Sequence, residues 1–250
     1  MNIYKDIETR TNGEIYIGVV GPVRTGKSTF IKRFMELMVL PAIADENNRK
    51  RAMDELPQSA AGKTVMTTEP KFIPKEAVEV LFEDGVHFKC RMIDCVGYMV
   101  QGAEGHEEDG KERLVKTPWF DYDIPFTKAA EIGTKKVIYD HSTVGIVVTC
   151  DDTISELDRS AYIQPETQTI QELKTLGKPF IVILNTRKPA SPETLELAQQ
   201  MEAEYGVGVL PINCDQLRKA DVVHIFEALL LDFPVTCVKF DIQNGWKHSI

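Results

Sequence analysis

The chain has 250 residues, of which 43% are hydrophobic and 27% are charged, so it can bury the core of one large domain or two small ones. Its 29 basic and 38 acidic side chains give a net charge of −9. This sign argues against broad, sequence-independent nucleic-acid binding, which needs a basic face. The chain has no run of about 18 apolar residues, so no transmembrane helix is expected.

The five cysteines are scattered and none stands in Cys-x-x-Cys spacing, so we expect buried free thiols in a reducing cytosol. They are Cys90, Cys95, Cys150, Cys214 and Cys237. The N-terminus has early acidic residues and no apolar core, so it is not expected to be a secretory signal.

Hydrophobic periodicity predicts alternating strands and helices. The expected strands are 15–20, 78–83, 86–94, 144–150, 179–185 and 207–212, and the expected helices are 27–40, 127–140, 166–176, 192–205 and 221–231. Asp84-Gly85 predicts a tight turn between the second and third strands, and Pro41 is expected to end the first helix. Segments 42–75 and 98–126 show little period, and residues 235–242 are strand-like before the sequence becomes polar.

This order of elements predicts an α/β fold. Alternating strands and helices favour a mostly parallel sheet with helices on both faces. The one antiparallel hairpin ends in Asp-x-x-Gly, at residues 94–97. A strand, loop and helix followed by such a hairpin is the order seen in GTPase-like domains.

Residues 21–28 read Gly-Pro-Val-Arg-Thr-Gly-Lys-Ser and match the phosphate-binding loop (P-loop) pattern G-x-x-x-x-G-K-[ST]. The loop lies between a predicted buried strand and a predicted helix, so backbone N–H groups and the helix N-terminus can face phosphate oxygens. We therefore predict a nucleoside triphosphate with Mg²⁺. The expected contacts are Gly21, Pro22, Val23, Arg24, Thr25, Gly26, Lys27, Ser28 and Thr29, with Lys27 on the β- and γ-phosphates and Ser28 on the metal.

Two further segments are expected to reach the γ-phosphate and the metal. Asp94, at the end of a strand, can hold Mg²⁺ through water, and Gly97 can offer its N–H to the γ-phosphate. Thr67 and Thr68 lie in the loop before the hairpin, and either one could bind Mg²⁺ only when a γ-phosphate is present. The sequence does not choose between the two threonines.

The choice of base is predicted from the segment after strand 179–185. GTPases carry Asn-Lys-x-Asp there, and the Asp accepts two hydrogen bonds from guanine. This chain has Asn185-Thr186-Arg187-Lys188. We retain Asn185 as a nucleotide contact, but the cation of Lys188 cannot accept those bonds, which favours ATP or loose base choice.

Two positions near the phosphates differ from common GTPase chemistry. Many GTPases place a Gln after Asp-x-x-Gly to orient the attacking water, whereas this chain has Tyr98, which we interpret as a packing residue. Hydrolysis is therefore expected to be slow unless another group positions water. Arg24 could act as an internal arginine finger, although a place facing solvent or an acidic neighbour is favoured. Residues 151–153 are interpreted as a turn or helix start, with a water or base contact as the alternative.

The sequence blocks resemble the stage IV sporulation protein A family, spore-coat morphogenetic ATPases of endospore-forming bacteria. The resemblance extends to about Pro234 and rests on blocks 18–30, 54–64, 66–72, 94–98, 130–138 and 140–145. Block 54–64, for example, reads Asp-Glu-Leu-Pro-Gln-Ser-Ala-Ala-Gly-Lys-Thr. The long blocks outside the P-loop are far more specific than the loop itself.

This resemblance implies a TRAFAC GTPase-like P-loop NTPase fold, a three-layer sandwich, that has switched to ATP. It implies Walker A Lys27, Walker B Asp94 and sensor threonines Thr67 and Thr68. It also implies an ATPase domain over 1–234, with 235–250 beginning a further segment. Family members are about twice as long. Their ATP hydrolysis drives self-assembly into a layer on the outer forespore surface, which recruits the coat.

We therefore expect a mother-cell cytoplasmic ATPase with ATP and Mg²⁺ as its ligands. Its expected partners are itself and, through the second half of full-length members, coat proteins and a small membrane-surface anchor protein. In full-length members it would lie peripherally on the outer forespore membrane. A nucleotide-gated interaction module with negligible hydrolysis is the main alternative, and a small-molecule kinase is a weaker one because no arginine-rich lid is visible. Segments 42–75 and 98–126 are expected to rearrange with the γ-phosphate.

Overall fold

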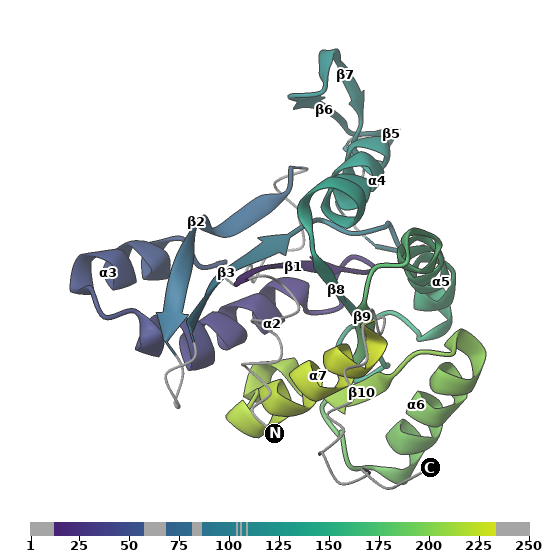
Figure 1. Ribbon diagram of the computed structural model, residues 1–250. Helices are drawn as coiled ribbons and strands as arrows, with labels where there is room; N and C mark the ends of the chain where they lie inside the picture. The colour runs from purple at the N-terminus through teal and green to yellow at the C-terminus, as the bar shows by residue number, and fades with distance from the viewer. Residues whose placement is uncertain are drawn as a thin grey trace, which may run out of the picture.

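A six-stranded sheet forms the centre of the molecule (Figure 1). The computed structural model describes residues 13–57, 69–81, 87–103, 105, 107–108 and 110–233. The sheet has the order β10-β9-β8-β1-β3-β2, and its strands are β1 (Glu14–Val20), β2 (Lys71–Leu81), β3 (His87–Asp94), β8 (Val144–Cys150), β9 (Phe180–Asn185) and β10 (Val209–Ile212). All neighbouring pairs are parallel except β2 with β3.

Helices cover both faces of this sheet because its strands are apolar on both sides. In β9, Ile181 and Ile183 face one core, whereas Phe180, Val182 and Leu184 face the other. The first core is closed by α2 (Lys27–Phe34) and α7 (Lys219–Asp232), and the second by α5 (Ser160–Leu176) and α6 (Pro192–Tyr205). The predicted three-layer α/β sandwich with one antiparallel strand pair is therefore confirmed.

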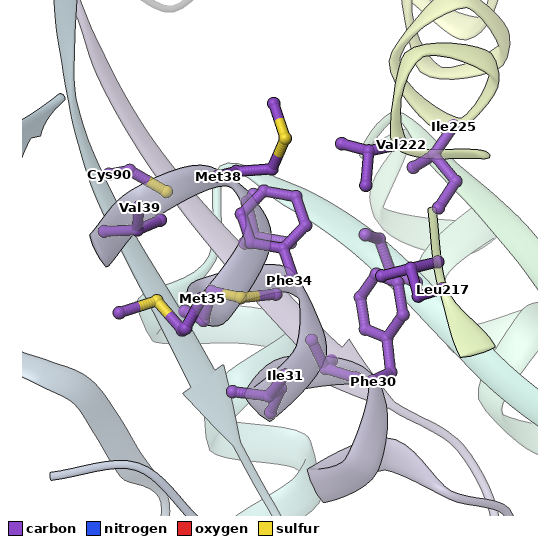
Figure 2. Close-up of a cluster of buried hydrophobic side chains, with 14 of the residues drawn as sticks. Phe30, Ile31, Phe34, Met35, Met38, Val39, Cys90, Leu217, Val222 and Ile225 are labelled. Carbon is purple, nitrogen blue, oxygen red and sulfur yellow. The ribbon is translucent and has the colours of Figure 1, made fainter. Parts of the chain in front are cut away.

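The core beneath the P-loop helix is closely packed (Figure 2). Phe30 and Phe34 project from α2 toward Val222 and Ile225 of α7, while Cys90 of β3 lies on the other side of α2. Each of these side chains is at most 2% exposed. This packing fixes the axis of α2, and therefore the direction of its N-terminus, against the sheet.

Several boundaries differ from those predicted. The first helix leaves the α-helical pattern after Phe34 and continues as a π-helical segment (Met35–Val39) and a 3₁₀ turn (Leu40–Ala42), so Pro41 lies inside its last turn. Helix α5 begins at Ser160, six residues before the predicted start, and contains Pro165. Pro165 has no backbone N–H, so α5 lacks one intrahelical hydrogen bond in its second turn, but the helix continues through it.

Segment 42–75, predicted to have little regular structure, contains a helix and part of a strand. Helix α3 (Glu46–Asp54) was missed because it buries only Ala52 and so has no apolar stripe. Asp45 caps it by accepting a hydrogen bond from the Asn48 N–H at 2.7 Å. Strand β2 starts at Lys71, seven residues before the prediction, and its register shifts between Ile73 and Val78.

Segment 98–126, also predicted to be irregular, contains two small hairpins. The first pairs β4 (Glu107–Glu108) with β5 (Lys111–Glu112), and the second pairs β6 (Leu114–Thr117) with β7 (Phe120–Pro125). The second hairpin extends away from the sheet before α4 (Phe126–Lys136) (Figure 1). It has few buried positions, so the alternation that marks a core strand is weak.

The remaining elements lie close to their predicted positions. Helix α4 continues as a π-helical segment (Val137–His141), and α6 has the predicted bounds of 192–205. A 3₁₀ turn (Cys214–Gln216) precedes α7. The predicted Asp84-Gly85 turn and the strand-like segment 235–242 lie outside the described residues.

Candidate nucleotide-binding site

The predicted P-loop connects β1 to α2 at the carboxyl end of the parallel strands. Gly21 has φ +127°, and a Cβ there would lie 2.3 Å from the Val148 carbonyl oxygen. Gly26 has φ +96°, and a Cβ there would lie 2.4 Å from the Asn185 side-chain nitrogen. Between them, the Thr25 hydroxyl donates to the Pro22 carbonyl at 3.0 Å. The sequence pattern thus has a steric cause, because both fixed glycines lie where other residues would collide.

The loop residues differ in what they can present to a ligand. Val23 is buried and packs with Cys150 and Tyr162, and its N–H already donates to the Tyr98 carbonyl at 2.9 Å. Thr25 is also buried, whereas Ser28 is exposed. Gly26 is the N-cap of α2, and among the described residues no side chain caps this helix. The N-terminal N–H groups of α2 can therefore serve an anion.

Lys27 lies folded over the loop. Its Nζ donates to the carbonyl oxygens of Pro22 at 2.5 Å and Gly21 at 3.3 Å, and the residue is 5% exposed. Burial lowers the pKa of this ammonium, while the Asp94 carboxylate is among the charges that oppose the shift. An ammonium held at the loop by carbonyl oxygens can exchange these partners for phosphate oxygens.

Ser28 and Asp94 meet at the N-terminus of α2. The Ser28 hydroxyl donates to Asp94 Oδ2 at 2.7 Å. Asp94 Oδ1 is buried and has no hydrogen-bond partner among the described residues. Burial raises the pKa of this carboxyl, and the Ser28 hydrogen bond and the Lys27 charge oppose that effect.

This pair fits a magnesium ion. A buried carboxylate oxygen without a donor is costly, and a hard cation would satisfy it. A hydroxyl and a carboxylate are oxygen ligands of the kind Mg²⁺ takes together with water and phosphate. Within the described residues no group of three His, Cys, Asp or Glu side chains forms a separate metal cluster.

Gly97 packs directly on the loop. It has φ +96°, and a Cβ there would lie 2.1 Å from the Gly21 carbonyl oxygen and 2.6 Å from Lys27 Nζ. The structure therefore brings the Asp-x-x-Gly segment to the P-loop, as expected from the order of elements. The Gly97 backbone therefore lies beside both the loop and the Lys27 ammonium.

Asn185 joins the loop to the far end of the sheet. Its side-chain nitrogen donates to the Thr25 carbonyl at 2.9 Å, and its oxygen accepts from the Cys214 N–H at 3.0 Å. The residue is 4% exposed. The side chain therefore fixes the P-loop against the segment after β10, which is a support role that the sequence did not reveal.

The segment expected to read the base lies beside Asn185. Arg187 and Lys188 are both exposed, and the Arg187 N–H donates to the Thr153 hydroxyl at 2.9 Å. The Asp151 carboxylate accepts from the Thr153 N–H at 2.9 Å and from its hydroxyl. Residues 152–154 form a turn here, which agrees with the favoured interpretation of this cluster.

The two positions that differ from common GTPases are also defined. Arg24 is exposed and is a non-glycine residue with positive φ, at 62°. Tyr98 is 5% exposed, and its hydroxyl donates to Glu172 Oε2 at 2.5 Å. Tyr98 is thus a packed residue, as predicted. Its partner Glu172 lies 74 positions away in the sequence and carries no motif that could have singled it out.

Thr67 and Thr68, predicted as sensor residues and metal ligands, lie outside the described residues. Thr29, predicted as a nucleotide contact, is half-buried in the first turn of α2. None of the helices within the described ranges is both long and apolar enough to cross a membrane.

A three-layer α/β sandwich with a P-loop after its first strand defines the class, a P-loop NTPase fold. Residues 1–234 match the family described as stage IV sporulation protein A, ATPase domain, and the chain belongs to this family. Stage IV sporulation protein A of Clostridioides difficile (strain 630) is 56% identical over 249 residues, covering 100% of this chain and 50% of the relative.

Other relatives agree in name and coverage. The Bacillus subtilis (strain 168) protein is 52% identical and the Bacillus anthracis protein 51% identical, each over 244 residues, covering 98% of this chain and 50% of the relative. The chain thus spans about half the length of the curated relatives it matches. A solved structure of an SsGBP variant aligns with 92% of this chain and 63% of its own, at 16% identity and a TM-score of 0.47.

Proposed function

We propose that this domain binds ATP with Mg²⁺ and hydrolyses the bond between its β- and γ-phosphates. The observation that carries the proposal is the meeting of three groups at the N-terminus of α2. These are the Lys27 ammonium on the loop, the Ser28 hydroxyl, and an Asp94 carboxylate with one buried oxygen that has no hydrogen-bond partner in the described part of the chain.

Each group has a distinct task in this proposal. Ser28 and Asp94 would hold Mg²⁺, which when bound neutralises charge on the phosphate oxygens. Lys27 would orient the β- and γ-phosphates and stabilise negative charge that develops between them. Gly97 would donate its backbone N–H to the γ-phosphate. Thr67 or Thr68 would complete the metal site when a γ-phosphate is present.

Adenine is the proposed base because of the residue at position 188. A GTPase would need a carboxylate there to accept two hydrogen bonds from guanine, and Lys188 can only donate. Lys188 is exposed beside the Asn185 support, so its ammonium is free to approach a base without first being uncovered. Discrimination against guanine follows from two donors that would be left unpaired.

In the full-length protein, we propose that this turnover drives assembly of identical chains on the outer forespore membrane surface from the mother-cell cytoplasm. The family's description as an ATPase domain and the relatives' names as sporulation proteins support the ATPase activity and the sporulation setting of this proposal. Coat proteins and a small membrane-surface anchor protein would bind through the half of the relatives that this chain does not span. Nucleic acid is not an expected partner.

A nucleotide-gated interaction module with negligible hydrolysis is the second candidate, and one contact favours it. The Tyr98 hydroxyl, at the position where many GTPases place a water-orienting Gln, is held by Glu172. If no other group orients water, the γ-phosphate would act mainly as a conformational signal.

The deciding experiment compares phosphate release from ATP and GTP by the unsubstituted protein, Lys27→Ala and Lys32→Ala. Lys32 lies on α2 outside the loop and is half-buried, so it is the matched control. We expect turnover with ATP, little with GTP, and loss of turnover in Lys27→Ala alone. Strong GTP preference would overturn the adenine assignment, and unchanged turnover in Lys27→Ala would overturn the site. ATP binding without phosphate release, in a single-turnover measurement, would select the interaction module.

A further inference from the structure

The segment after Asp94 is held from two sides. On the loop side, the Tyr98 carbonyl oxygen accepts from the Val23 N–H at 2.9 Å, and Pro22 and Tyr98 form a parallel β-bridge. On the other side, the Tyr98 hydroxyl donates to Glu172 Oε2 on α5 at 2.5 Å. The backbone of this residue is therefore fixed to the P-loop, and its side chain to a helix on the far face of the sheet.

The acceptor in this contact is itself oriented. Glu172 Oε1 accepts from the Gln168 side-chain nitrogen at 3.4 Å and lies 3.8 Å from Lys135 Nζ of α4. Lys135 is held in turn by Glu131, at 2.7 Å. The Glu172 side chain is only 16% exposed, so two helices limit the directions it can take. Its free rotation is already restricted before any ligand arrives.

The donor stays protonated over the working pH range. Burial raises the pKa of the Tyr98 hydroxyl, and its hydrogen bond to Glu172 raises it further. The hydroxyl therefore remains a donor to a carboxylate, which is one of the stronger kinds of protein hydrogen bond.

Gly97 is the residue that benefits from this restraint. Its φ of +96° is open to glycine, and the same residue could adopt several other backbone conformations. A flexible glycine would have to be ordered when the γ-phosphate binds, which would weaken binding. Because Tyr98 is held at both its backbone and its side chain, it restricts the backbone conformations of Gly97 before the nucleotide binds.

We propose that Tyr98 and Glu172 are positioning residues that hold the Gly97 N–H ready for the γ-phosphate. The proposal rests on the proposed function and deepens it. Tyr98 stands where many GTPases have a water-orienting Gln, and here its hydrogen bond to Glu172 positions the backbone instead. This positioning would give the site a preference for a triphosphate over a diphosphate. Neither residue needs to touch the nucleotide.

The test measures the affinities of a non-hydrolysable ATP analogue and of ADP, each with Mg²⁺, by calorimetry. Tyr98→Phe keeps the ring and removes the hydroxyl, and Glu172→Ala removes the acceptor from the other side. We expect each to weaken the ATP analogue about tenfold, since charge-assisted hydrogen bonds have that effect. ADP affinity should stay unchanged. Glu172→Gln keeps an acceptor oxygen and should restore most of the preference.

Tyr205→Phe is the matched control. The Tyr205 hydroxyl donates to Glu166 Oε1 at 2.7 Å, which is a second buried tyrosine–glutamate hydrogen bond, between α6 and α5 and away from the P-loop. Its removal should leave the ratio of the two affinities unchanged. The double variant Tyr98→Phe with Glu172→Ala should be no weaker than either single variant, because both remove the same bond.

Two failures are distinguishable. If the unsubstituted protein does not bind the ATP analogue, the proposed function is overturned and the positioning role with it. If it binds the analogue but Tyr98→Phe and Glu172→Ala keep the normal ratio, or lose both ligands equally, the positioning role alone is overturned. An equal effect of Tyr205→Phe would also overturn it, because the loss would then follow from general packing.

Discussion

At the scale of single residues, the glycines of the site are the most constrained positions. Gly21, Gly26 and Gly97 all have positive φ, and a Cβ on each would lie within 2.4 Å of another atom. The P-loop pattern identifies Gly21 and Gly26, but only the folded structure shows which atoms a side chain at each position would clash with. Gly97 would strike the P-loop itself.

Gly97→Ala is therefore predicted to weaken nucleotide binding. The new Cβ would lie 2.1 Å from the Gly21 carbonyl oxygen, so the segment must move away from the loop. Positive φ adds a strain of about 1–3 kcal/mol, and the melting temperature should fall. Gly110→Ala is the control, because Gly110 has φ +72° and open space around it. Calorimetry with the ATP analogue should show a loss only for Gly97→Ala, and equal binding by both variants would contradict the packing described here.

Asn185 shows why some roles are invisible in the sequence. Its place after β9 is predictable, and it was expected to contact the nucleotide. Its actual hydrogen bonds go to the Thr25 carbonyl and the Cys214 N–H, which lie 160 positions before it and 29 after it. Such a support is created only when three distant segments meet.

At the scale of elements, prediction succeeded where one pattern dominated. The strand Phe180–Asn185 and the helix Pro192–Tyr205 have strong apolar patterns or clear caps, and both lie within one residue of the predicted ends. The prediction missed helix α3 because its one buried residue, an alanine, produces no hydrophobic periodicity, although Asp45 supplies a good capping residue.

The Asp45 cap gives a direct test of α3. Asp45→Ala removes the acceptor of the Asn48 N–H, and loss of such a cap typically costs about 1 kcal/mol. For a domain of this size the melting temperature should fall by about 2–4 °C. Asp45→Asn retains a side-chain oxygen and should remain close to the unsubstituted protein. Thermal unfolding followed by circular dichroism makes the comparison, and equal melting temperatures for the two variants would contradict the cap.

At the scale of the whole molecule, the burial of cysteines links stability to pH. The described cysteines are all free and buried, as predicted, whereas Cys237 lies outside the described residues. Burial raises the pKa of the Cys95 thiol to about 11 and of the Cys90 and Cys150 thiols to about 12. In the unfolded chain such thiols have a pKa of about 8.5.

Stability should therefore fall as pH rises from 9 toward 11. In this window the unfolded chain loses thiol protons that the folded protein keeps, so the free energy of unfolding decreases with pH. Each buried thiol contributes a slope of up to about 1.4 kcal/mol per pH unit. Urea unfolding under reducing conditions at pH 8, 9 and 10 measures the slope. Cys90→Ala removes one thiol and should make the slope shallower, and an unchanged slope would contradict the assignment.

The sequence by itself determined the P-loop, the order of the strands in the central sheet and of the helices that cover it, the antiparallel strand pair and the family. These depend on local patterns, namely glycines at fixed spacing and apolar residues at the period of a strand or helix. Tertiary structure alone decided that Asn185 supports the loop and that Tyr98 is hydrogen-bonded to Glu172. It also decided that Asp94 has a buried oxygen with no partner among the residues that the structure describes. The physical reason is that a hydrogen bond between distant residues depends on where the packed layers place them, and no local pattern encodes that distance.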